Sequence, residues 1–206
     1  VYVDNGTLID DLENQQNSIL DLRSVSTLPG GHNWQNAAAA YAAARAAEIE
    51  PDKIAQAIQS FAGLPHRQEL ICEINGVAYI NDSKATNTEA AAKALLCCDN
   101  IHWIAGGQFK EENLGAIEQM LPQVKHAYLI GEAQVQLAGL IGSNVPSSSC
   151  GDLETALMAA HQAAQEAGNG TVLLSPACAS FDQFTDFEQR GDTFRDLVNK
   201  LERGDA

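Results

Sequence analysis

Basic residues are scarce in this sequence of 206 residues: 12 lysines and arginines stand against 27 aspartates and glutamates, giving a formal net charge of −15. A chain this acidic lacks the positive surface that attracts nucleic acid or an anionic membrane, so neither is expected as a partner. No apolar run approaches the roughly 20 residues that a membrane-spanning helix needs, and the first residues do not resemble a signal peptide. These absences favour a globular protein of the cytoplasm.

Two kinds of binding motif are also missing. The five cysteines include an adjacent pair, Cys97 and Cys98, but no paired C-x-x-C spacing that would indicate a metal site. An odd number of cysteines without an export signal is typical of thiols in a reducing compartment. The phosphate-binding pattern G-x-x-x-x-G-K-[ST] does not occur, and no glycine is followed by lysine.

The first thirty residues predict short strands that do not form a core by themselves. Asn5-Gly6 favours a type I′ hairpin turn between strands at 1–3 and 7–9. Further along, a strand is expected at 18–22 and helices at 34–47 and 52–62, the second ending at a glycine. Because this segment opens directly in a hairpin, the beginning of its domain is expected to lie upstream.

Two carboxamides, Asn33 and Asn36, stand three residues apart at the start of the first helix and so share a face. Each offers a paired donor and acceptor, which suits the edge of a purine base. The alternative is that Asn33 caps the helix and Asn36 is solvated. The local pattern alone favours this alternative.

Leu-Pro-His-Arg at residues 64–67 predicts a linker, because a new β pattern begins directly after it. The expected domains are therefore residues 1–65 and 66–206. Arg67 is either a surface charge or a phosphate ligand at a hinge.

From residue 70 onward the pattern predicts an α/β fold, a Rossmann-like, mostly parallel sheet flanked by helices. A hairpin at 70–80 comes first, and single strands at 102–105, 127–130 and 171–174 alternate with helical segments. In such sheets ligands bind at the carboxyl ends of the strands.

Three polar or glycine-rich turns, residues 82–86, 106–110 and 176–181, follow predicted strands and are expected along that edge. In the first turn, Thr86 and Glu89 read as a capping box, which leaves Asp82 and Lys84 unexplained. A carboxylate there suits a sugar hydroxyl, and an ammonium suits phosphate or carboxylate oxygens. The alternative for the third turn is close packing of small residues after a strand.

Several stretches together resemble the Mur ligases, the ATP-dependent amide ligases of bacterial peptidoglycan synthesis. They are Gly-His-Asn with Asn36 (31–36), Leu-Pro-His-Arg (64–67), Asn-Asp-Ser-Lys-Ala-Thr-Asn (81–87), Ser-Pro-Ala-Cys-Ala-Ser-Phe-Asp (175–182) and Phe-Glu-Gln-Arg-Gly (187–191). The last of these is similar to the branch of the family that adds D-glutamate to UDP-N-acetylmuramoyl-L-alanine. The resemblance covers essentially the whole chain in order.

The resemblance implies that residues 1–65 are the end of a central ATP-binding domain and residues 66–206 an amino-acid-binding domain. The substrates implied are D-glutamate, ATP and UDP-N-acetylmuramoyl-L-alanine, with Mg²⁺ held mainly by residues upstream of this chain, and a monomer is expected. Lys84 would be catalytic, between the phosphates and the amino acid. The implied nucleotide contacts are Asn33, Asn36, Arg67 and Asp82, and the implied D-glutamate contacts are Lys84, Thr86, Lys110, Ser180, Phe181 and Phe187. Gln108 departs from the family pattern, because it stands in a glycine-turn segment where some relatives carry an acid.

The missing P-loop then predicts that this chain has no ligase activity by itself. Two other interpretations stay open: a related amide ligase such as a folylpolyglutamate synthase, and a non-catalytic Rossmann-type ligand-binding module.

Overall fold

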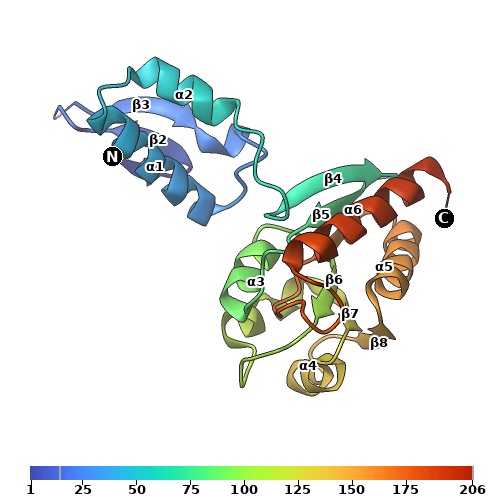
Figure 1. The fold of residues 1–206 in the computed structure, drawn as a ribbon. Coiled ribbons are helices and arrows are strands. Elements are labelled where there is room, and N and C mark those ends of the chain that lie inside the picture. The colour runs from blue at the N-terminus through green and yellow to red at the C-terminus, as the bar shows by residue number, and fades with distance from the viewer. Residues whose placement is uncertain (14, 206) are drawn as a thin grey trace. The chain divides into compact units, whose positions relative to one another are not determined.

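The computed structural model describes residues 1–13 and 15–205, which form two compact units, Val1–Gly63 and Leu64–Ala206. Figure 1 shows the first unit in blue to cyan and the second in green to red. Each is considered separately below. Among the described helices, none is long and apolar enough to cross a lipid bilayer.

The first unit contains a three-stranded antiparallel sheet in the order β1-β2-β3. Its strands are β1 (Tyr2–Asp4), β2 (Thr7–Asp10) and β3 (Asn17–Asp21). Asn5 and Gly6, between β1 and β2, both have positive φ angles of 45° and 81°. A type I′ turn requires this conformation at both central residues, so the predicted hairpin is confirmed.

A short 3-10 turn, η1 (Leu22–Ser24), precedes the two helices of this unit, α1 (Gly31–Ala46) and α2 (Pro51–Gln59). Leu8, Tyr41 and Ile58 are among the buried residues that join the sheet to the helices. The Tyr41 hydroxyl donates to Asp10 Oδ2 at 2.8 Å, and burial together with this bond raises the pKa of Tyr41 to about 12. The small core is therefore closed by a polar contact as well as by apolar packing.

The second unit contains a six-stranded sheet in the order β4-β5-β9-β6-β7-β8. The first pair, β4 (Glu69–Ile74) and β5 (Val77–Asn81), is antiparallel, and the other neighbours are parallel. The remaining strands are β6 (Ile101–Gly106), β7 (Val124–Ile130), β8 (Ser147–Gly151) and β9 (Gly170–Leu174). The last strand in the sequence, β9, lies between β5 and β6, which brings the ends of distant segments together.

Apolar clusters cover both faces of this sheet. One contains Trp103 and Leu173 and lies under α3 (Thr88–Leu95), the 3-10 helix η2 (Gly115–Gln123) and α4 (Gln134–Ile141). The other contains Ile104 and Leu174 and lies under α5 (Leu153–Ala167) and α6 (Phe187–Arg203). Consecutive strand residues thus face opposite layers. The predicted α/β class with a mostly parallel, helix-flanked sheet is confirmed.

Three local elements differ from the sequence-based expectations. The N-cap of α3 is Asn87, whose Oδ1 accepts from Ala90 N, so the predicted capping box with Thr86 as the cap was wrong. Strand β8 was not among the predicted strands, because Ser147 to Cys150 show neither alternation nor an apolar run. Helix α1 begins at Gly31, earlier than expected, and its N-cap is Gly30 without a side-chain cap. Asn33 is therefore not the cap; its Nδ2 donates to Pro29 O at 2.7 Å from inside the first turn.

Buried polar contacts fix helix α6 to the start of the second unit. The Asn81 side chain, fully buried, donates through Nδ2 to Gly191 O at 3.1 Å and lies 3.1 Å from His66 Nδ1. His66 is 6% exposed. A side chain at position 191 would collide with the His66 ring, so the helix can approach only through a glycine.

Gly191→Ala should therefore destabilise the protein by about 1–3 kcal/mol, because the new methyl group forces the His66 ring or the helix to move. Gly139→Ala in α4 is the matched control, since a Cβ there meets nothing within 4 Å. It should stabilise by up to about 1 kcal/mol through helix propensity. Urea denaturation of both variants measures the difference, and equal effects would contradict this account of Gly191.

Candidate functional site

The three turns predicted from the sequence meet at the carboxyl edge of the six-stranded sheet. The turn after β5 joins the end of β9 through Asp82 N to Leu174 O at 2.7 Å. The turn after β6 joins the turn after β9 through two backbone bonds between Gln108 and Ala179, at 2.8 and 3.1 Å. Residues 82–86, 106–110 and 176–181 thus form one continuous rim.

Glycines allow the middle turn to lie this close. Gly106 and Gly107 have φ angles of 135° and 127°, which L side chains rarely adopt. A Cβ on Gly106 would collide with Ile130 O, and one on Gly107 with Ala179 O. The Gly-Gly pair is thus required by close backbone approach on both sides.

Arg190, from α6, lies beneath the rim and holds all three turns. Its guanidinium donates to Ser83 O (2.9 Å), Cys178 O (3.1 Å) and Gly106 O (3.4 Å), and its Nε donates to Ser83 Oγ (3.0 Å). The residue is 1% exposed, and burial lowers its pKa to about 10. It therefore stays protonated at neutral pH and brings a positive charge under the rim.

Lys84 is held against an aromatic ring at the start of α6. Its Nζ lies 3.7 Å from the ring centroid of Phe187, a cation–π contact. The neighbouring Ser83 Oγ donates to Phe187 O at 2.8 Å while accepting from Arg190. The ring of His66 meets Phe187 edge to face at 6.1 Å. The Lys84 ammonium group is thus held in place by contacts between two segments that lie about 100 residues apart in the sequence.

Asp82 is a buried carboxyl, 7% exposed, at the end of β5. Oδ2 accepts from Ser175 Oγ at 2.8 Å, and Oδ1 accepts from the Gln68 backbone N–H at 3.1 Å. Burial raises the pKa of Asp82 to about 7, against the opposing effects of these hydrogen bonds and of the Arg67 charge. The group can therefore accept or donate a hydrogen bond near neutral pH.

The other predicted residues of the second unit lie on or beside the rim. Ser180 is 2% exposed and Phe181 is 64% exposed, directly after the backbone bridge at Ala179. Lys110, two residues after the same bridge, and Thr86 are both exposed. Arg67, also exposed, precedes the Gln68 N–H that bonds Asp82.

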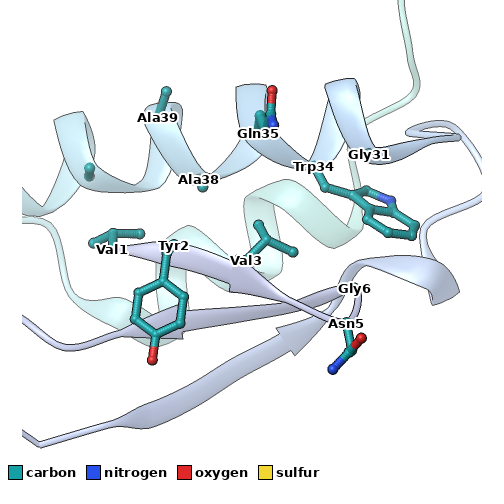
Figure 2. A pocket seen from close by; sticks show the side chains of 11 residues that line it. Val1, Tyr2, Val3, Asn5, Gly6, Gly31, Trp34, Gln35, Ala38 and Ala39 are labelled. Atoms are coloured by element: carbon teal, nitrogen blue, oxygen red, sulfur yellow. The ribbon is translucent and has the colours of Figure 1, made fainter. Parts of the chain in front are cut away.

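Asn33 and Asn36 belong to α1 of the first unit, where Asn36 is exposed. Figure 2 shows a cavity of this unit, about 650 Å³, between β1 and α1. Tyr2 and Trp34 are among the residues that line this cavity, whereas Asn33 and Asn36 are not. Within the described residues, the buried Trp34 Nε1 has no hydrogen-bond partner.

No group of three or more His, Cys, Asp or Glu side chains suited to a metal ion occurs in residues 1–13 and 15–205. The side-chain donors that the three turns carry instead include Lys84, Lys110 and Ser180. Such a set suits anionic oxygens rather than a cation.

Sequence reasoning assigned no role to the residues that support the rim from below, Arg190, Ser83, Asn81 and His66, although all four lie in the stretches that carry the family resemblance. Buried arginines are rare, so nothing in the pattern indicated that Arg190 is buried. Gly191 was the available signal, because a glycine inside a helix costs about 1 kcal/mol relative to alanine and indicates close packing.

Asp82→Asn should change the pH dependence of stability. The native pKa near 7 lies above the ordinary value of 3.8, so the folded state binds more protons between these values. Ionisation of this carboxyl therefore destabilises the fold progressively as pH rises through that window. The variant should gain stability relative to wild type as pH rises from about 4 to 7, by at most on the order of 4 kcal/mol, and the difference should stay constant above pH 7.

Urea midpoints at four pH values measure this gain, and Asp196→Asn, at an exposed position of α6, is the control that should follow wild type. A difference between Asp82→Asn and wild type that stays constant from about pH 4 to 7 would contradict a raised pKa for Asp82.

Solved structures share this fold. The folylpolyglutamate synthase/dihydrofolate synthase of Yersinia pestis matches 90% of this chain with 42% of its own, at a TM-score of 0.61 and 21% identity. The UDP-N-acetylmuramate-alanine ligase of Thermotoga maritima matches 85% of the chain with 39% of its own, at a TM-score of 0.60 and 15% identity.

Closer sequence relatives carry one common name, UDP-N-acetylmuramoylalanine–D-glutamate ligase. The protein of Rhodospirillum rubrum is 51% identical over 96% of this chain and 42% of its own length. That of Paramagnetospirillum magneticum is 48% identical over 100% of this chain and 45% of its own length. The chain thus spans less than half the length of these relatives. Residues 66–178 match the family described as Mur ligase, glutamate ligase domain. This chain belongs to the Mur ligase family.

Proposed function

We propose that this chain acts, within a protein of its relatives' length, in the ATP-dependent addition of D-glutamate to UDP-N-acetylmuramoyl-L-alanine. Leu64–Ala206 would bind D-glutamate, and Val1–Gly63 would belong to the ATP-binding domain. The two relatives at 48% and 51% identity, both named for this reaction, support the proposal.

The observation that carries the proposal is the donor set at the rim. A dicarboxylate needs two sites of positive charge and several neutral donors. Lys84 would meet one carboxylate and Lys110 the other, while Ser180 and Thr86 would supply hydroxyls. Phe181, 64% exposed, would cover the carbon chain together with Phe187.

Amide formation from a carboxylate and an amine requires an activated acid. ATP supplies this activation by phosphorylating the carboxylate of the acceptor. The D-glutamate amine then attacks the acyl carbon, and the tetrahedral intermediate releases inorganic phosphate and a proton. Lys84, held over Phe187, would stabilise the negative charge that develops on the oxygens during this attack.

The nucleotide contacts follow from the same chemistry. Asp82 would bind a ribose hydroxyl, a role open to either protonation state, and Arg67 would meet phosphate or ribose oxygens. On the first unit, the Nδ2 of Asn33 is bonded to Pro29, so its amide oxygen and the exposed Asn36 would meet the adenine edge. Mg²⁺ would serve this reaction through the nucleotide phosphates, and we assign it no ligand among the described residues.

Lys110→Ala should weaken D-glutamate binding by about 10–100-fold, because a charged hydrogen bond contributes about 1.5–3 kcal/mol. Isothermal titration of the 206-residue chain with D-glutamate measures this, and L-glutamate tests the chirality. Lys125→Ala is the matched control, since Lys125 is exposed near the start of β7, at the opposite edge of the sheet. Equal affinity of Lys110→Ala and Lys125→Ala would refute the assignment of Lys110.

The full reaction can be tested in a chimera that joins this chain to the remaining part of the Rhodospirillum rubrum relative in place of its matching segment. We expect D-glutamate-dependent phosphate release and formation of the amide product, lost in Lys84→Ala. The isolated 206-residue chain, which lacks a P-loop, should show neither. A folded chimera that uses L-lysine or another amino acid in preference to D-glutamate would reject the proposed substrate.

A further inference from the structure

Arg190 donates hydrogen bonds to backbone carbonyl oxygens, one in each of the three turns. Ser83 O, Gly106 O and Cys178 O each accept from its guanidinium, and each belongs to a different segment of the chain. The fourth bond, from Nε to Ser83 Oγ, links the guanidinium to the hydroxyl that also bonds Phe187 O. One side chain therefore fixes the relative positions of all three turns.

Burying a cation in this way is costly. The four acceptors are uncharged oxygens, and a guanidinium removed from water is compensated best by a carboxylate. An apolar side chain of similar volume could fill the space at lower cost. The arrangement therefore suggests that Arg190 has a role beyond filling the core.

Each accepting carbonyl lies close in sequence to a residue assigned to the ligand. Ser83 directly precedes Lys84, and Cys178 precedes Ser180 by two positions. Gly106 begins the turn that ends at Lys110. A shift of any carbonyl would change the spacing between these ligand-facing groups, and displacements of about 1 Å are enough to weaken binding and catalysis strongly.

We propose that Arg190 is the positioning residue of the D-glutamate site: it sets the spacing of the three turns, and its buried charge favours a dianionic ligand above them. The D-glutamate part rests on the function proposed above, whereas the clamping of the turns does not. Arg190 itself does not touch the substrate.

The test uses the 206-residue chain with two replacements, Arg190→Met, which removes the charge and the bonds, and Arg190→Lys, which keeps the charge. Calorimetry with D-glutamate gives the affinity. Amide hydrogen exchange at Gly106 and Gln108, whose N–H groups bond Pro176 O and Ala179 O, reports on the turns. Val198→Ala, a fully buried position of the same helix, is the control for general loss of stability.

We expect Arg190→Met to lose D-glutamate affinity by tenfold or more and to speed exchange at Gly106 and Gln108. Arg190→Lys should restore part of the affinity, since it keeps the charge but cannot span three carbonyls. Val198→Ala should bind within twofold of wild type, with unchanged exchange at the two reporter amides.

Affinity within twofold of wild type in Arg190→Met, or equal losses in Arg190→Met and Val198→Ala, would overturn the proposal. If Arg190→Met does not fold, Arg190→Lys decides by the same criteria. Wild-type protein that binds no D-glutamate would instead refute the proposed function. The exchange rates at Gly106 and Gln108 would then still test whether Arg190 holds the turns. Rates that are unchanged in both Arg190→Met and Arg190→Lys would reject that role.

Discussion

The carboxyl edge of the six-stranded sheet in the second unit depends on one buried guanidinium, that of Arg190. The three turns consist mainly of small and polar residues, and they meet the apolar core through the small side chains of Ala85, Ala177 and Cys178 and the partly buried Phe109. Arg190 supplies what packing does not, by donating to a carbonyl of each turn from a position that is 1% exposed. Because hydrogen bonds from a charged donor are stronger than neutral ones, this single residue can order three backbone segments.

Arg190 can do this only because α6 itself is fixed at that end. The next residue, Gly191, packs against His66 and receives a hydrogen bond from Asn81 at its carbonyl. At the N-terminus of the helix, Asp186 Oδ1 accepts from Gln189 N, and the Gln189 side chain accepts from Thr185 N, both at 2.7 Å. These reciprocal bonds resemble a capping box. The cap, the clamp and the glycine contact all lie within residues 185–191.

Sequence patterns located the rim but not what supports it. The turns were predictable because each follows a short apolar strand, and parallel strands place their carboxyl ends together. The burial of Arg190 was not predictable, since a buried arginine looks like any surface arginine in sequence, even though residues 187–191 carried the family resemblance. Strand β8 was missed for a related reason: Ser147 to Cys150 gain their structure from backbone pairing with β7 rather than from an apolar face. Hydrogen bonds between segments that are distant in the sequence produce no periodic pattern of residues, so a sequence pattern cannot predict them.

The bonds of Arg190 act on the backbone of the turns, whereas the proposed ligand contacts are side chains. Three of the four bonds of Arg190 end on main-chain carbonyls, which every residue possesses, so they constrain the path of the turns and not their composition. Lys84, Thr86, Lys110 and Ser180 are then free to differ without loss of the rim. Two solved structures at 15% and 21% identity share this fold, so the same backbone arrangement tolerates large changes of sequence.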